Sequence, residues 1–236
     1  MSTPIDTRVT PSLHAETLKA IDGYDEEHSA PILASALEAL DDAYLTLIKL
    51  HDARDAAKKN QAWSEGQQVL VVSEAAWKQQ QRIAQKFDSV RNTLDKQITH
   101  FEQELSQPLE SRAGVGISSE IRKFAKDLSS EELHKFLRGA ISEGDHTTVS
   151  AVLGAPAYLS GLDTNFQKGY VRMWHERTAP DKAMKLKAVR NAKTLIEQRS
   201  GLLFKEIEKA MGASWITVNE LRQGNDKALA ALKFDS

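Results

Sequence analysis

Cysteine is absent from this chain of 236 residues. Without a thiol the chain can form no disulfide bond, no cysteine-ligated zinc site and no covalent intermediate on a thiolate. Proline and glycine are also scarce, with 6 and 12 residues, and both disfavour the interior of a helix. Because Ala, Leu, Lys, Glu and Gln are abundant instead, the composition predicts a chain that is helical nearly throughout.

Long apolar runs are missing as well. No run approaches the roughly 18 apolar residues that a membrane-spanning helix needs, so we expect no membrane span. The first residues, MSTPIDTRVTPS, lack the apolar core of a secretion signal, so we expect no export by a signal peptide. The cytosol, or a particle assembled there, is the expected location.

The recognised catalytic motifs are missing too. The chain contains no Gly-x-Ser-x-Gly, no phosphate-binding glycine-rich loop and no dinucleotide fingerprint. Glu131-x-x-His134 has the spacing of a carboxylate-bridged di-metal site, but such a site needs a second pair and two further glutamates. His51, beside Asp52 and Asp55, fits a buried polar residue that sets helix register. We therefore expect no enzyme, cofactor, metal or small-molecule substrate.

The net charge of −2 hides an uneven distribution along the chain. Residues 1–110 contain 11 Lys and Arg against 18 Asp and Glu, whereas residues 111–236 contain 20 against 15. An acidic first half and a basic second half can attract each other, within one chain or between copies.

The stretch from Gly66 to Gln107 is predicted to form one long helix. It contains no proline, and its apolar residues recur at steps of three and four. At about 1.5 Å per residue the helix would be roughly 60 Å long. A four-residue step from Leu94 to Ile98 interrupts the seven-residue repeat and locally unwinds a supercoil. The apolar positions are Val69, Ala76, Ile83, Phe87, Val90, Leu94, Ile98, Phe101 and Leu105.

A second amphipathic helix precedes it. Ser29 can cap its start, Pro31 suits its first turn, and residues 60–66 then reverse the chain. An antiparallel helical hairpin follows from this order. Its second arm is the longer one, so Phe101 and Leu105 need another surface: the N-terminal segment, the C-terminal half or a second subunit. The heptad positions of the first arm are Leu33, Leu37, Leu40, Tyr44, Leu47, His51 and Arg54.

The predicted fold class is all-α, a long coiled-coil-like antiparallel hairpin followed by a multi-helix C-terminal half. Pro108, Gly114 and Gly116 mark the best linker in the sequence. Ser118 or Ser119, and then Ser129 or Ser130, are predicted to cap the next two helices. The last long helix is predicted from Pro180 or Asp181 to about Met211, with a break at Gly201, and a terminal helix over 214–232 with a break at Gly224. The predicted domains are an N-terminal arm (1–28), the hairpin (29–107), the linker (108–117) and a basic helical domain (118–236).

Residues 207–219 resemble a helix-turn-helix. An apolar helix end is followed by Gly212, by Ser214 as a cap and by a second helix. Two positions depart from the motif: Glu208 stands where a small alanine is usual, and Trp215 is bulky. The resemblance implies DNA binding as an alternative function. The residues that would contact nucleic acid are Lys205, Lys209, Ser214, Thr217, Asn219 and Arg222.

Residues 117–122 (ISSEIR) and 137–162 (LRGAISEGDHTTVSAVLGAPAYLSGL) resemble helical proteins that tailed bacteriophages and prophages encode near their particle-building proteins. The resemblance implies a virion component or assembly factor, located in the virion or in the host cytoplasm during assembly. Its partners would be further copies of itself and other virion proteins, and a transient scaffold or assembly chaperone is a second alternative. The candidate protein contacts are Phe101, Leu105, Tyr158, Leu159, Trp174 and Trp215.

Overall fold

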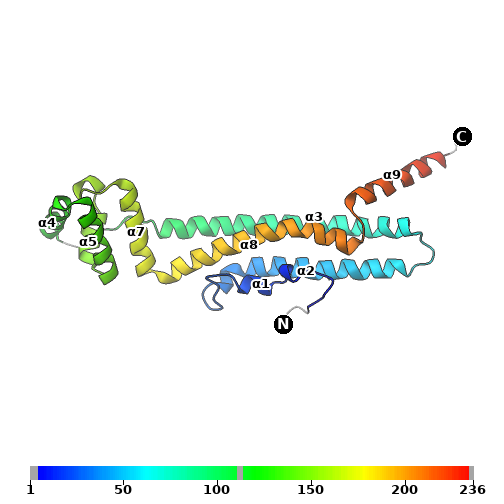
Figure 1. Ribbon diagram of the computed structural model, residues 1–236, viewed down its shortest axis with the longest axis horizontal. Coiled ribbons are helices and arrows are strands. Elements are labelled where there is room, and N and C mark those ends of the chain that lie inside the picture. Colours follow the sequence, from blue (N-terminus) through cyan, green and yellow to red (C-terminus); the bar gives the residue numbers. More distant parts are fainter. Residues whose placement is uncertain (1–4, 111–113, 234–236) are drawn as a thin grey trace. The chain divides into compact units, whose positions relative to one another are not determined.

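The computed structural model describes residues 5–110 and 114–233, in which every regular element is a helix (Figure 1). This confirms the prediction of an all-α chain with a long helix pair followed by a multi-helix half. The chain divides into two compact units. The first comprises residues 1–95 and 188–236, and the second comprises residues 96–187. Both boundaries fall inside long helices rather than in loops.

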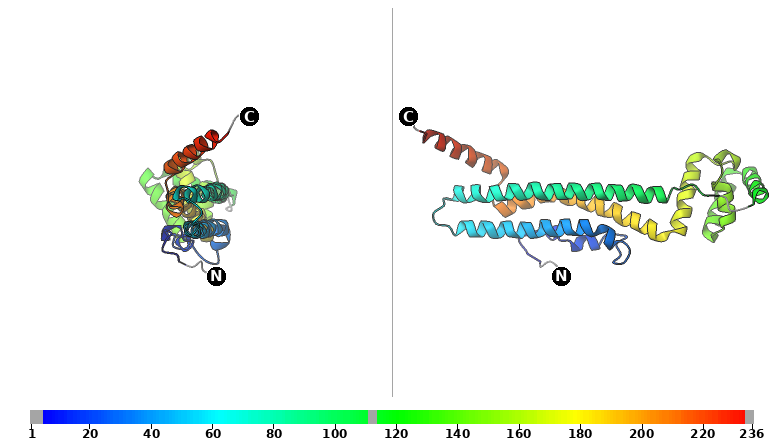
Figure 2. Two further views of the ribbon diagram at one scale, coloured as in Figure 1. Left: turned by 90° about the vertical axis from the view of Figure 1, so that its right-hand side faces the viewer. Right: turned by 180° about the vertical axis from the view of Figure 1, so that it is seen from behind.

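Three long helices lie side by side in the first unit (Figures 1 and 2). Helix α2 spans Ala30–Lys58, α3 spans Glu65–Glu104, and α8 spans Pro180–Met211. Arg82 Nη1 of α3 lies 2.6 Å from Asp42 Oδ2 of α2, and Lys193 Nζ of α8 lies 2.6 Å from Asp95 Oδ1 of α3. The predicted hairpin is therefore completed by a third helix.

Helix α2 buries a wider face than its heptad pattern alone predicts. Leu33, Leu40 and Tyr44 are fully buried, as expected. A second row of small residues is buried as well: Ala36, Ala39 and Ala43. A helix that packs against two neighbours needs two contact rows, and alanines let a second backbone approach closely. The extra row therefore indicates that α2 is covered on more than one side.

The buried stripe of α3 runs almost as predicted. Ile83, Phe87, Val90 and Leu94 are all buried. Gln80 is buried too, although the pattern indicates that it faces water. The helix is continuous through the four-residue step at Leu94.

The N-terminal arm packs on this unit from its first described residues. It contains a 3-10 turn, η1, at Pro11–Leu13 and a short helix, α1, at Glu16–Lys19. Leu13 and Leu18 are fully buried. The amide of Thr10 donates to Glu206 Oε2 of α8 at 3.1 Å, and Asn191 Nδ2 of α8 donates to the Asp22 carbonyl at 2.8 Å.

The second unit is a bundle of shorter helices around one apolar cluster. The elements between its long helices are α4 (Val115–Asp127), α5 (Ser130–Glu143), α6 (His146–Leu153), η2 (Ala157–Leu159) and α7 (Thr164–Thr178). Its buried cluster includes Leu137 and Trp174, with Leu133, Ile141, Val149, Val152, Leu153, Tyr170 and Val171.

Local capping explains where these helices begin and end. The Ser129 hydroxyl accepts from the Glu132 amide and the Glu132 carboxylate accepts from the Ser129 amide, which is a capping box. This confirms the predicted start of α5. Gly144 ends the helix with a φ of 77°, which favours glycine, and the Asp145 side chain caps α6.

Several predicted boundaries differ from the structure. Helix α4 begins at Val115, inside the predicted linker 108–117, whose residues 111–113 lie outside the described part of the chain. Gly201 does not interrupt α8, and Gly224 does not interrupt the terminal helix α9 (Trp215–Ala231). The two compact units also divide the chain differently from the predicted hairpin and basic domain. A single glycine therefore does not always end a helix, and the positions of proline and glycine do not indicate which elements pack together.

Candidate protein-interaction surfaces

Three of the six predicted contact residues belong to the core of the chain. Phe101, Leu105 and Trp174 are only 9%, 2% and 3% exposed, so they do not form the docking surface predicted for them. The start of α8 lies beside the end of α3 in the second unit, where Lys182 Nζ is 3.1 Å from Glu104 Oε1. The end of the longer hairpin arm, α3, therefore lies beside the start of α8, which belongs to the C-terminal half.

The other three predicted contact residues keep some exposure. Tyr158 and Leu159 in η2 are 72% and 40% exposed. Trp215 is partly buried because its ring meets Trp77 edge to face, with centroids 5.6 Å apart. Trp77 itself is half exposed.

The connection between α8 and α9 (Trp215–Ala231) is a helix, a turn and a helix. Gly212 adopts a φ of 80°, and the Ser214 hydroxyl accepts from the Thr217 amide at 3.2 Å. Glu208 Oε1 accepts from the Trp215 amide at 3.0 Å. This contact explains the departure from the motif, because an alanine could not satisfy an amide in the first turn of α9.

The predicted nucleic-acid residues lie on both sides of this turn. Lys205, Asn219 and Arg222 are exposed. Lys209 Nζ lies 3.6 Å from Glu206 Oε2, and Thr217 Oγ1 lies 3.0 Å from the Ser214 hydroxyl. Ser214 and Thr217 thus form the helix cap, and Lys209 faces a carboxylate of its own helix.

The outer α9 segment, residues 222–233, leads away from the three-helix bundle (Figures 1 and 2). Each of its residues is exposed, including Leu229 at 54% and Leu232 at 65%. Before it, Val218 is fully buried and Leu221 lies against Gly66 at the start of α3. An apolar helix face therefore begins in the bundle at Val218 and Leu221 and, beyond the polar Asn225, continues into water.

A groove between α4 and α5 forms a second apolar surface. Its volume is about 410 Å³. Phe124 is 55% exposed and meets Phe136 edge to face at 5.4 Å. A Cβ on Gly139 would meet nothing within 4 Å, so this lining residue leaves the space above it open. The lining residues are Phe124, Leu128, Glu132, Lys135, Phe136, Gly139, Ala140, Glu143 and Asp145.

The α4 side of this groove was not predicted, although its signal is in the sequence. Ile117, Ile121, Phe124 and Leu128 recur at steps of four, three and four. Ile117 is 57% exposed, whereas Ser118 and Ala125 on the same helix are buried. A helix that buries small residues and exposes large apolar ones has an outer face suited to a partner.

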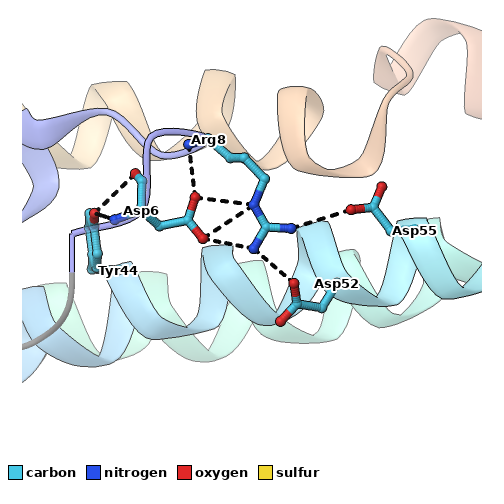
Figure 3. Close-up of polar contacts among 5 residues, drawn as sticks. All are labelled: Asp6, Arg8, Tyr44, Asp52 and Asp55. Atoms are coloured by element: carbon cyan, nitrogen blue, oxygen red, sulfur yellow. Dashed lines mark hydrogen bonds and ion pairs between the residues drawn. The ribbon is translucent and has the colours of Figure 1, made fainter.

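A cluster of charges fastens the N-terminal arm to α2 (Figure 3). Arg8 Nη2 lies 2.7 Å from Asp6 Oδ2 and 2.8 Å from Asp52 Oδ1, and Arg8 Nη1 lies 3.3 Å from Asp55 Oδ2. The Asp6 amide donates to the Tyr44 hydroxyl at 2.8 Å. Hydrogen bonds from the Arg8 side chain and amide lower the pKa of Asp6 to about 2. We therefore interpret the cluster as a structural contact that holds the arm on α2.

His51 is buried, as its heptad position predicts. Its Nε2 has no hydrogen-bond partner in the described parts of the chain. Burial lowers the pKa of His51, and the charges of Arg8 and Lys209 lower it further.

Glu131 and His134 have the spacing of half a di-metal site, but in the structure the His134 ring contacts a tyrosine. His134 Nδ1 lies 2.7 Å from the Tyr170 hydroxyl. Across residues 5–110 and 114–233, no three His, Asp or Glu side chains are grouped so as to hold a metal ion. Within the same ranges no helix combines the length and apolarity needed to cross a membrane.

The chain matches no protein-family model, no curated protein and no solved structure. The likeness of residues 117–162 to phage proteins therefore stays a prediction. Two exposed apolar surfaces remain as candidate sites of interaction, the outer α9 segment and the α4–α5 groove.

Proposed function

We propose that this chain is a non-enzymatic structural or assembly protein that acts through helix-mediated contacts with other proteins. The exposed apolar face of α4, continuous with the α4–α5 groove, is the observation that supports this proposal most directly. The proposed setting, a bacteriophage particle, comes from the resemblance of residues 117–162. There the chain would contact further copies of itself and other virion proteins.

An exposed apolar face of this kind favours a partner on energetic grounds. Removing apolar surface from water contributes roughly 25 cal/mol per Å². Ile117 and Phe124 lie on one helix, with the partly buried Ile121 between them. Such contiguous exposure is typical of protein–protein interfaces, whereas single exposed apolar residues are ordinary.

The experiment is to compare incorporation of variants into particles purified from a phage-producing host. We expect the wild-type chain in particles or in their precursors, and we expect Phe124→Glu to reduce its incorporation roughly tenfold or more. Phe166→Glu is the matched control, because Phe166 of α7 is also 55% exposed but lies outside the groove. Far-UV circular dichroism would check that both variants fold.

Absence of the chain from particles and precursors would contradict the proposal, and so would equal incorporation of both variants. Presence only in precursors would assign the transient scaffold or chaperone role. Presence in mature particles would assign a permanent component.

The turn between α8 and α9 supports a DNA-binding regulator as the second candidate function. Its Gly212 conformation and Ser214 cap are those a helix-turn-helix requires. Under this candidate, duplex DNA would bind with an affinity that falls steeply as salt is added, and Arg222→Ala would reduce that slope. A lack of DNA affinity at low salt would exclude it.

A further inference from the structure

We infer that the outer α9 segment of one copy docks into the α4–α5 groove of a second copy, so that chains join head to tail. This inference rests on the proposed function and specifies its partner. Each of the two surfaces has exposed apolar residues, and their net charges are opposite.

A partner would add stability to the outer α9 segment. Its residues from Arg222 to Lys233 are all exposed, whereas the start of the same helix is anchored by buried Val218. Most helical stability in proteins comes from packing of an apolar face rather than from intrinsic propensity. Its apolar side chains lie on one face: after a seven-residue step that spans the polar Asn225, Ala228 and Leu232 lie on the same helix face as Val218 and Leu221. That face is the one a groove would cover.

The α4–α5 groove fits an amphipathic helix. Phe124, Leu128 and Phe136 supply apolar walls, whereas the small residues Gly139 and Ala140 leave space in the groove. Small residues let a helix backbone approach closely. The binding of an amphipathic helix by its apolar face in such a groove is a recurring mode of recognition.

The charges around the two surfaces are opposite. The groove is lined by three acidic residues, Glu132, Glu143 and Asp145, and one basic residue, Lys135. The outer α9 segment carries three basic residues and one acidic residue: Arg222, Lys227, Lys233 and Asp226. All eight side chains belong to exposed residues. Opposite charges around an apolar centre orient the encounter and disfavour pairing of like surfaces.

A second copy is the favoured occupant because the same chain supplies both complementary surfaces. Pairing of two outer α9 segments would instead place like net charges together. A contact between two different patches is heterologous, so it generates either a ring or an open chain of copies. Either outcome suits a structural or assembly protein.

Two alanines of α9 provide a matched pair of variants. Ala228 and Ala230 are both exposed, and two helical steps place them on nearly opposite faces. We expect the mass of the wild-type chain, measured by light scattering, to increase with concentration. Ala228→Glu should weaken association roughly tenfold or more, whereas Ala230→Glu should associate like the wild type.

A groove variant then identifies the occupant. Gly139→Gln fills the open lining position and replaces glycine with a better helix former, so we expect it to fold. Alone, Gly139→Gln and Ala228→Glu should each be monomeric. Mixed, they should form a one-to-one complex, because one retains the α9 surface and the other retains the groove.

Several results would overturn the inference. These are a wild-type chain that stays monomeric at all concentrations, equal association of the two alanine variants, or no complex in the mixture. Pairing between α9 segments would leave Gly139→Gln associated. If the chain is monomeric yet enters particles in a Phe124-dependent way, the inference fails and the proposed function stands.

Discussion

His51 is the residue whose environment has the clearest consequence for stability. It is 6% exposed, and its Nε2 finds no hydrogen-bond partner among the described residues. Arg8, Arg54 and Lys209 add positive potential at the ring, and Asp6 opposes them. Protonation of the imidazole therefore costs more in the folded chain than in the unfolded chain.

We predict that the free energy of unfolding falls as the pH is lowered below 6.5. The folded-state pKa of His51 lies below its ordinary value of 6.5, so in this range the unfolded chain binds more protons. The contribution of the neutral His51 ring to stability is therefore complete above pH 6.5. It is lost as the pH falls through the folded-state pKa of His51. Asp6 remains ionised there, because its pKa is about 2. Urea unfolding at a series of pH values from 8 to 5 measures the effect.

His51→Gln should flatten this pH dependence, since the variant has no group to protonate at that position. His100→Gln is the control, because the His100 side chain is 64% exposed. If the two variants keep the same pH dependence as the wild type, His51 is not its source.

Among the elements, the end of α8 shows how a turn is fixed by a distant side chain. Gly212 directly follows α8 with a positive φ of 80°. Arg54 Nη1 of α2 donates to the Lys209 carbonyl in the last turn of α8 at 3.4 Å. A Cβ on Gly212 would collide with the Arg54 guanidinium. Glycine is needed here for both the backbone conformation and the approach of the arginine.

We predict that Gly212→Ala lowers the free energy of unfolding by about 1–2 kcal/mol, because it strains the turn and displaces Arg54. Gly201→Ala should have the opposite sign. Gly201 lies inside α8 with open space around its Cβ position, so alanine should stabilise the helix by roughly 0.5–1 kcal/mol. Denaturant midpoints at constant slope would measure both. A Gly212→Ala midpoint equal to that of the wild type would refute the account of the turn.

At the scale of the whole molecule, two compact units each enclose buried residues. Leu40 is fully buried in the first unit, and Leu137 is fully buried in the core cluster of the second. Units with separate cores can unfold in separate steps.

We predict two thermal transitions in calorimetry. Leu137→Ala should destabilise one of them by about 2–5 kcal/mol, and Leu40→Ala should destabilise the other by a similar amount. A single transition that both variants shift together would show that the units unfold as one.

Local features were the most predictable part of this fold. The helix start at Ser129 and the stripe from Ile83 to Leu94 follow from near neighbours in the chain, and both were predicted, the former as a cap at Ser129 or Ser130. The burial of Gln80 and of the alanine row of α2 was not, because the local apolar pattern does not indicate it. The candidate surfaces divide the same way. Tyr158 and Leu159 are exposed as expected, whereas Phe101, Leu105 and Trp174 are covered by other parts of the chain.

The sequence by itself determined that the chain is helical, where most helices begin, and which face of each long helix is apolar. These properties depend on residues within one or two turns of each other. Only the tertiary structure decided that α8 completes the hairpin and that large apolar residues of α4 and of the outer α9 segment are exposed among the described residues. An apolar stripe indicates that one face of a helix packs against another surface. Which surface covers it depends on contacts between residues distant in sequence.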